Sequence, residues 1–148
     1  MDKNKLIYKD LSYQIIGILF EVSNELGYGY QEKYFEKAVE DGFKSRMINY
    51  EKQILYKIIF QGKTIGYYRL DFLIENKIIL EIKTGKRFTK KDFDQVKGYL
   101  KATGKKLAIM AIFTYSGVKF YRVLNVNNQI EQKAIELNTI KLRKFFNL

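Results

Sequence analysis

Residues 69–83 have the sequence RLDFLIENKIILEIK, in which two apolar runs flank the polar triplet 75–77. Side chains alternate between the two faces of a strand, so the register of this hairpin decides which residues are buried. A turn at residues 75–77 gives one face three apolar pairs: Ile74 with Ile78, Phe72 with Leu80, and Leu70 with Ile82. We expect this face to form part of the core. A two-residue turn would mix acidic and core residues on one face, and we reject it.

The other face of the same hairpin brings acidic and basic side chains together. It pairs Leu73 with Ile79, Asp71 with Glu81, and Arg69 with Lys83. Two opposed carboxylates repel unless a cation lies between them, and Mg²⁺ and Mn²⁺ prefer such oxygen ligands. The alternative is a surface hairpin with solvated ion pairs, but the apolar run 78–82 is typical of a strand covered on both faces.

Lys83 follows Glu81 by two residues and is therefore predicted to lie on the same face. Its ammonium group could hold a water bound to a metal ion, stabilise charge that develops on a phosphate, or bind the scissile phosphate. The sequence leaves these three roles open.

The aspartate, the short hairpin and the Glu-x-Lys triplet together resemble the core motif of the PD-(D/E)xK nuclease superfamily. The segment LGYGYQEKYFEKA, residues 26–38, is similar to the Gly-x-x-Glu-x-x-Tyr signature of the GxxExxY family in that superfamily. Gly29 and Glu32 match the signature, whereas Phe35 replaces its tyrosine and lacks the hydroxyl group. Residues 66–73 and 95–104 are also similar, and the resemblance covers about residues 10–124.

This resemblance implies an α/β, restriction-endonuclease-like fold with a divalent metal site. The implied metal ligands are Asp71, Glu81, the backbone carbonyl of Ile82, and Glu32. An alternative for Glu32 is a helix N-terminal acid that interacts only with the helix dipole.

The resemblance also implies catalytic roles for five residues: Asp71, Glu81, Lys83, Glu32 and Gln95. Relatives often have a histidine three residues before this glutamine, where this chain has Asp92. The alternative for Gln95 is an ordinary exposed helix amide.

Composition excludes several kinds of chemistry. The 148 residues are 47% hydrophobic, which suits one domain, residues 1–148. With neither cysteine nor histidine, the chain has no thiolate zinc site, disulfide, thiol nucleophile or histidine base. The apolar stretch at residues 15–20 is far shorter than the ~20 residues that span a bilayer. We see no signal peptide and expect a cytoplasmic protein that does not bind membranes.

The net charge of +11, from 27 basic and 16 acidic residues, favours a polyanionic partner. We expect nucleic acid, with DNA preferred over RNA. The residues expected to contact its backbone are Lys86, Arg87, Lys90, Lys91 and Arg69, and Lys97, Lys101, Lys105 and Lys106 extend this patch. A general compositional bias toward lysine is the alternative explanation.

Hydrophobic periodicity predicts a mixed sheet flanked by helices. The helices are predicted at about 8–26, 31–45, 90–102 and 131–146, and the strands at about 52–60, 64–74, 77–83, 106–113 and 118–124. The first three strands form an antiparallel meander, and Thr89 caps the third helix. The second helix is expected to bury Tyr34, Phe35, Ala38 and Val39, while the last helix covers the core or forms a dimer contact.

Two classes of function agree with these features. The first is a nuclease dependent on Mg²⁺ or Mn²⁺ that hydrolyses phosphodiester bonds, and we prefer it. The second is a catalytically inactive protein that binds nucleic acid with the same fold. A dimeric enzyme resembling Holliday-junction resolvases would share the chemistry of the first class.

Overall fold

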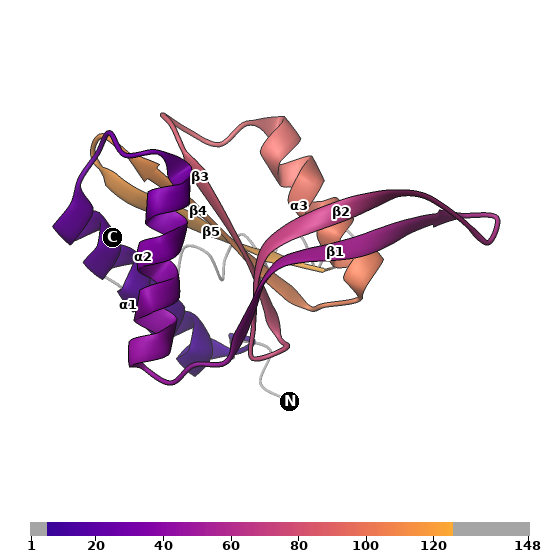
Figure 1. The fold of residues 1–148 in the computed structure, drawn as a ribbon, viewed down its shortest axis with the longest axis horizontal. Coiled ribbons are helices and arrows are strands. Elements are labelled where there is room, and N and C mark those ends of the chain that lie inside the picture. Colours follow the sequence, from indigo (N-terminus) through magenta and orange to yellow (C-terminus); the bar gives the residue numbers. More distant parts are fainter. Residues whose placement is uncertain (1–5, 126–148) are drawn as a thin grey trace.

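The computed structural model describes residues 6–125, which fold into three helices and one five-stranded sheet (Figure 1). The elements are α1 (Lys9–Leu26), α2 (Glu32–Ser45), β1 (Tyr50–Phe60), β2 (Lys63–Ile74), β3 (Ile78–Thr84), α3 (Lys90–Thr103), β4 (Leu107–Thr114) and β5 (Gly117–Leu124). The strand order is β1-β2-β3-β4-β5, with β3 and β4 parallel and the other neighbours antiparallel. The predicted mixed sheet and antiparallel meander are therefore confirmed.

The helices cover the two faces of this sheet separately (Figure 1). Helices α1 and α2 pack on one face, where Phe72, Leu80 and Ile82 belong to the larger hydrophobic cluster. Helix α3 packs on the other face, with Leu73 and Ile79 in a second cluster. Strand β3 is buried on both faces, as its continuous apolar run predicts.

The register of the β2–β3 hairpin is the one predicted for a turn at residues 75–77. The backbone pairs are Phe72 with Leu80, Leu73 with Ile79, and Ile74 with Ile78. Lys77 N donates to Ile74 O at 2.9 Å, which closes the turn.

The predicted pairs beyond Phe72 are wrong, because regular pairing of β2 with β3 stops there. Leu70 lies in the cluster under α3 rather than beside Ile82. The alternation of side chains is interrupted at Asp71, which falls between paired residues on β2. Gln53, at the matching position of β1, has a left-handed φ of 53°. Similarly, Arg69 does not pair with Lys83 across the hairpin.

The other predicted elements agree with the structure to within about two residues, and Gly27 ends α1 as the C-cap residue. The buried stripe of α2 differs from the prediction because Tyr34 is exposed, and the stripe continues through Phe43.

The predicted helix at about 131–146 lies outside the described residues. None of the described helices is both long and apolar enough to cross a membrane.

Helices α1 and α2 approach closely at Gly42, where an added Cβ would lie 2.5 Å from Ile18 Cγ2. We expect Gly42→Ala to lower the free energy of unfolding by roughly 1–3 kcal/mol, because the overlap outweighs the better helix propensity of alanine. Gly17→Ala in α1 is the matched control, since its Cβ would be 3.6 Å from Arg46 Nη1, and it should stabilise by up to about 1 kcal/mol. Urea denaturation measures both, and equal effects of the two changes would contradict this account of the helix contact.

Candidate active site

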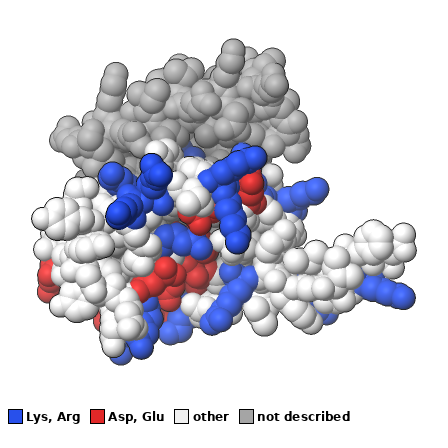
Figure 2. Space-filling view, turned by 90° about the horizontal axis from the view of Figure 1, so that it is seen from above, with Lys and Arg blue, Asp and Glu red and all other residues white. Residues whose placement is uncertain are grey.

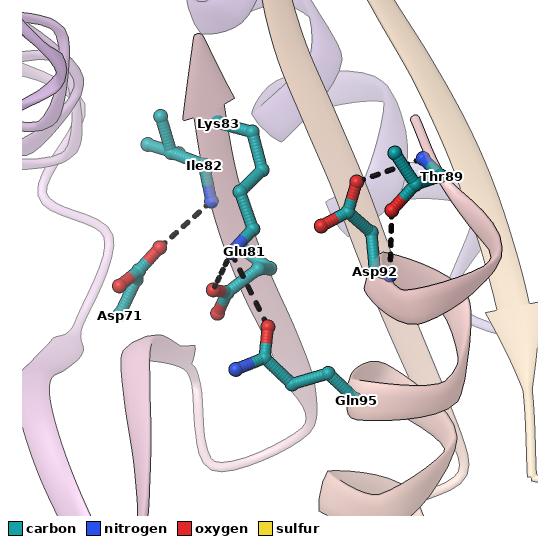
Figure 3. A network of polar contacts seen from close by, with 7 residues as sticks. All are labelled: Asp71, Glu81, Ile82, Lys83, Thr89, Asp92 and Gln95. Atoms are coloured by element: carbon teal, nitrogen blue, oxygen red, sulfur yellow. Dashed lines mark hydrogen bonds and ion pairs between the residues drawn. The ribbon is translucent and has the colours of Figure 1, made fainter. Parts of the chain in front are cut away.

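Asp71 lies where strands β2 and β3 separate (Figure 3). Its Oδ2 accepts a hydrogen bond of 2.8 Å from the backbone N–H of Ile82, so a side chain takes the place of a carbonyl in the ladder. The pKa of Asp71 is raised, chiefly by burial, although the Ile82 N–H and the Lys83 ammonium both oppose the shift. The local fold thus holds a carboxylate at the point where the two strands part.

Glu81 is a buried acid, 4% exposed, on the neighbouring strand. Its Oε2 has no hydrogen-bond partner among the described residues, and its Oε1 is 3.5 Å from Lys83 Nζ. Burial and the charge of Asp71 raise the pKa of Glu81 to about 8. A buried carboxylate oxygen without a partner, beside a second acid, is the environment that a divalent cation stabilises. These residues therefore fit the metal that the sequence motif implies.

Lys83 connects the acidic residues to α3 (Figure 3). Its Nζ donates a hydrogen bond of 3.2 Å to Gln95 Oε1 and forms the ion pair with Glu81. The structure therefore brings together Asp71, Glu81, Lys83 and Gln95, as expected. Gln95 is exposed, but its carbonyl oxygen fixes the position of the ammonium group.

Glu32, the first residue of α2, reaches the same site from the opposite face of the sheet. Burial and the charge of Asp71 raise its pKa, whereas Lys83 and a backbone hydrogen bond from Thr84 lower it. One turn later Glu36 joins it, and carboxylate oxygens of Glu32, Glu36 and Asp71 lie within 4.8 Å of one another. The pKa of Glu36 is raised to about 7, by burial first and then by Asp71 and Glu32.

The sequence interpretation missed Glu36, although a signal was present. Residues four apart lie on one face of a helix, so placing Glu32 at the site also places Glu36 near it. Glu40 follows on the same face, but its carboxylate has partners of its own. It accepts hydrogen bonds from Tyr50 Oη at 2.9 Å and from Lys52 Nζ at 3.0 Å. The three acids that remain close together are therefore Glu32, Glu36 and Asp71.

Asp92 has a structural role at the start of α3 (Figure 3). Its Oδ2 accepts a hydrogen bond of 2.8 Å from Thr89 N, while Asp92 N donates to Thr89 Oγ1 at 3.3 Å. This reciprocal pair is the capping box, which confirms Thr89 as the predicted N-cap. The carboxylate also raises the pKa of Glu32 at longer range.

Tyr99 is a second residue that the sequence interpretation did not assign to the site. It is buried, and the centroid of its ring lies 5.2 Å from that of Tyr68. Its pKa is raised by burial and then by the charges of Glu81 and Asp71. The phenol therefore stays protonated beside the two carboxylates.

Basic side chains flank the acidic group (Figure 2). Arg69 is exposed and lowers the pKa values of Asp71 and Glu36. Four more exposed cations follow β3, in the loop and the first turn of α3: Lys86, Arg87, Lys90 and Lys91. Lys105 does not extend this patch, because its Nζ donates to the carbonyl and side-chain oxygens of Asn76 at the hairpin turn, at 3.1 and 3.0 Å.

A family model described as the PD-(D/E)XK nuclease superfamily matches residues 9–123. The chain therefore belongs to this superfamily of nucleases, which act on nucleic acids, and its α/β architecture is the restriction-endonuclease-like fold expected from the motif. Among curated proteins, none matches the sequence significantly.

Solved structures that match this chain include three with low sequence identity. SSO0001 has a TM-score of 0.51 and 22% identity over 91% of this chain and 67% of its own. An alkaline exonuclease from Laribacter hongkongensis has a TM-score of 0.45 and 10% identity, covering 98% of this chain and 86% of its own. A phage-related exonuclease from Haemophilus somnus 129PT has a TM-score of 0.45 and 8% identity, covering 97% and 89%.

The raised pKa values predict how metal-free stability depends on pH. Between the pKa of an unfolded glutamate, about 4.3, and that of folded Glu81, about 8, the folded state binds more protons than the unfolded state. The free energy of unfolding should therefore fall as pH rises through this range. Thermal denaturation in EDTA at about pH 5.5, 7 and 8.5 measures the effect.

Glu81→Gln is the control for this pH dependence, because its side chain cannot ionise. The melting temperature of this variant should decrease less with pH than that of the wild type. Mn²⁺ should stabilise the wild type more at high pH, where the carboxylates are ionised. Identical pH profiles for the two proteins in EDTA would contradict the raised pKa of Glu81.

Proposed function

We propose that this protein is a metal-dependent nuclease that hydrolyses phosphodiester bonds in DNA, with Mg²⁺ or Mn²⁺ as cofactor. The observation that carries the proposal is the convergence of the buried Glu81 and the half-buried Asp71 with the ammonium group of Lys83. At the finer level we assign the chain to the GxxExxY family, and we treat residues 1–148 as one domain.

The proposed metal ligands are Asp71, Glu81, Glu32 and the backbone carbonyl of Ile82. The carbonyl is included because the N–H and C=O of a strand residue point toward the same neighbour, and the N–H of Ile82 points to Asp71. The oxygen-only donor set suits Mg²⁺ or Mn²⁺. When bound, the cation supplies Lewis-acid stabilisation of charge on the phosphate. The acid Glu36 lies close enough to contribute to the same charge balance.

The remaining residues hold the reacting groups in place. Lys83, oriented by Gln95 and Glu81, would position the attacking water or donate to a phosphate oxygen. Arg69, Lys86, Arg87, Lys90 and Lys91 would contact the phosphate backbone on both sides of the carboxylates.

Incubation of the purified protein with DNA and RNA substrates tests this function. The substrates are linear duplex, circular duplex, single-stranded and four-way branched DNA, and duplex RNA, each with Mg²⁺, Mn²⁺ or EDTA. We expect cleavage of DNA that depends on the metal. Tight binding with no cleavage of any substrate would instead identify an inactive binding protein, and selective cleavage of the branched DNA would identify a resolvase.

A further inference from the structure

The paired strands β1 and β2 extend beyond the body of the protein as a two-stranded arm (Figure 1). We define the β1–β2 arm as residues 54–69. One side of the arm packs toward α3, through Ile54, Tyr56 and Tyr68. The other side and the tip expose large apolar side chains, namely Leu55, Ile59, Phe60, Ile65 and Tyr67, of which Phe60 is 59% and Tyr67 57% exposed. Such a concentration of exposed apolar groups indicates a binding surface.

The charge of the arm identifies the kind of partner. From residue 52 to residue 70 the chain has four cations, Lys52, Lys57, Lys63 and Arg69, and no acid, although the whole chain has 16 acids. In Figure 2 the projecting arm accordingly shows white and blue atoms but no red. Two copies of an arm with only positive charges repel each other. Cations interspersed with aromatic rings instead suit a nucleic acid, which offers phosphates and base faces.

The exposed side of the arm is continuous with the acidic site. In the β1–β2 register Arg69 pairs with Leu55 and Tyr67 with Lys57, so cations and apolar groups alternate on this side. Arg69 lies two residues from Asp71 and influences its pKa. Lys63 at the tip is six positions before Arg69. At 3.3 Å per residue this is a reach of ~20 Å, or about six base pairs of B-DNA.

We propose that the β1–β2 arm binds duplex DNA beside the carboxylate site, a proposal that rests on the function proposed above. The major groove of B-DNA admits a two-stranded ribbon, whereas that of A-form RNA is too narrow and deep for side chains to read. Lys57 and Lys63 contact phosphates, and Tyr67 and Phe60 contact bases or sugars. The arm thus sets how the duplex lies relative to Asp71.

Fluorescence anisotropy with a labelled 30-base-pair duplex, in EDTA to prevent cleavage, tests the arm. The double variant Lys57→Ser/Tyr67→Ser removes a cation and an aromatic ring that face each other across β1 and β2 on the exposed side of the arm. We expect binding to weaken at least about tenfold, and the slope of log affinity against log salt to decrease by about 1. The matched control is Lys44→Ser/Met47→Ser, at the far end of α2, which removes an exposed cation and a side chain that is 89% exposed. Both variants should give wild-type circular dichroism spectra.

Several outcomes would overturn the proposal or support it. Equal DNA affinities for the two double variants would overturn it, and so would a wild-type dimer that the Lys57→Ser/Tyr67→Ser change dissociates in analytical ultracentrifugation. If the wild type cleaves DNA while the arm variant binds it normally, the arm proposal fails and the nuclease function stands. If the wild type cleaves DNA and the arm variant does so only at raised DNA concentration, both are supported. A wild type that neither binds nor cleaves any nucleic acid removes both.

Discussion

Asp71→Asn should reduce DNA cleavage by at least about 10³-fold, equivalent to about 4 kcal/mol of lost transition-state stabilisation. The amide is neutral and binds a divalent cation much more weakly than a carboxylate does. Its oxygen can still accept the hydrogen bond from Ile82 N, so the fold should persist. In EDTA above about pH 8, where Glu81 ionises, the variant should be more stable than the wild type, because one of two adjacent carboxylates is gone.

The measurements are initial cleavage rates at saturating DNA, metal affinity by isothermal titration calorimetry, and thermal denaturation in EDTA. Asp94→Asn is the matched control, because it makes the same chemical change at an exposed position of α3. Cleavage by Asp71→Asn at near the wild-type rate would reject this site. An unfolded Asp71→Asn protein would instead show that the carboxylate is needed for the strand junction.

Lys83→Met should lower cleavage by about 10²–10³-fold through a different step. The thioether side chain fills a similar volume but cannot donate to Gln95 or to a phosphate. Loss of the ammonium also removes a positive charge 3.5 Å from Glu81 Oε1, so metal affinity should be equal or higher at a pH where Glu81 is ionised.

The combination of slower cleavage and retained Mn²⁺ binding distinguishes Lys83→Met from Asp71→Asn, which should lose both. Calorimetry and single-turnover cleavage provide the two readouts. Lys44→Met is the control for loss of an exposed cation far from the site. If Lys83→Met lost Mn²⁺ binding along with cleavage, Lys83 would be a structural support of the metal site rather than a group that acts on the substrate.

The sequence was sufficient to predict most of the hairpin that carries the candidate site. The period-two pattern around Phe72 and Leu80 allows only one register that separates acids from core, and the structure has that register. The sequence did not reveal the interruption at Asp71, because it depends on a hydrogen bond from Ile82 across the strands and on the backbone of Gln53.

The acids of α2 show a second limit of sequence reasoning. Helical spacing places Glu36 on the same face of α2 as Glu32, but spacing alone does not show that this face turns toward Asp71. Its proximity to Asp71 arises only once α2 is packed across the sheet, which is a property of the tertiary fold. Tyr34 was assigned to the buried stripe for a related reason, since helical spacing alone does not fix the rotation of α2 about its own axis.

The close contact between Gly42 of α2 and Ile18 of α1 connects the carboxylates of α2 to α1, a helix that contributes no carboxylate to the site. A larger side chain at this contact would displace α2, and with it Glu32 and Glu36, relative to Asp71 on the sheet. For the proposed metal site, substitutions deep in the α1–α2 interface would therefore change the preferred size of the cation without altering any of the proposed ligands.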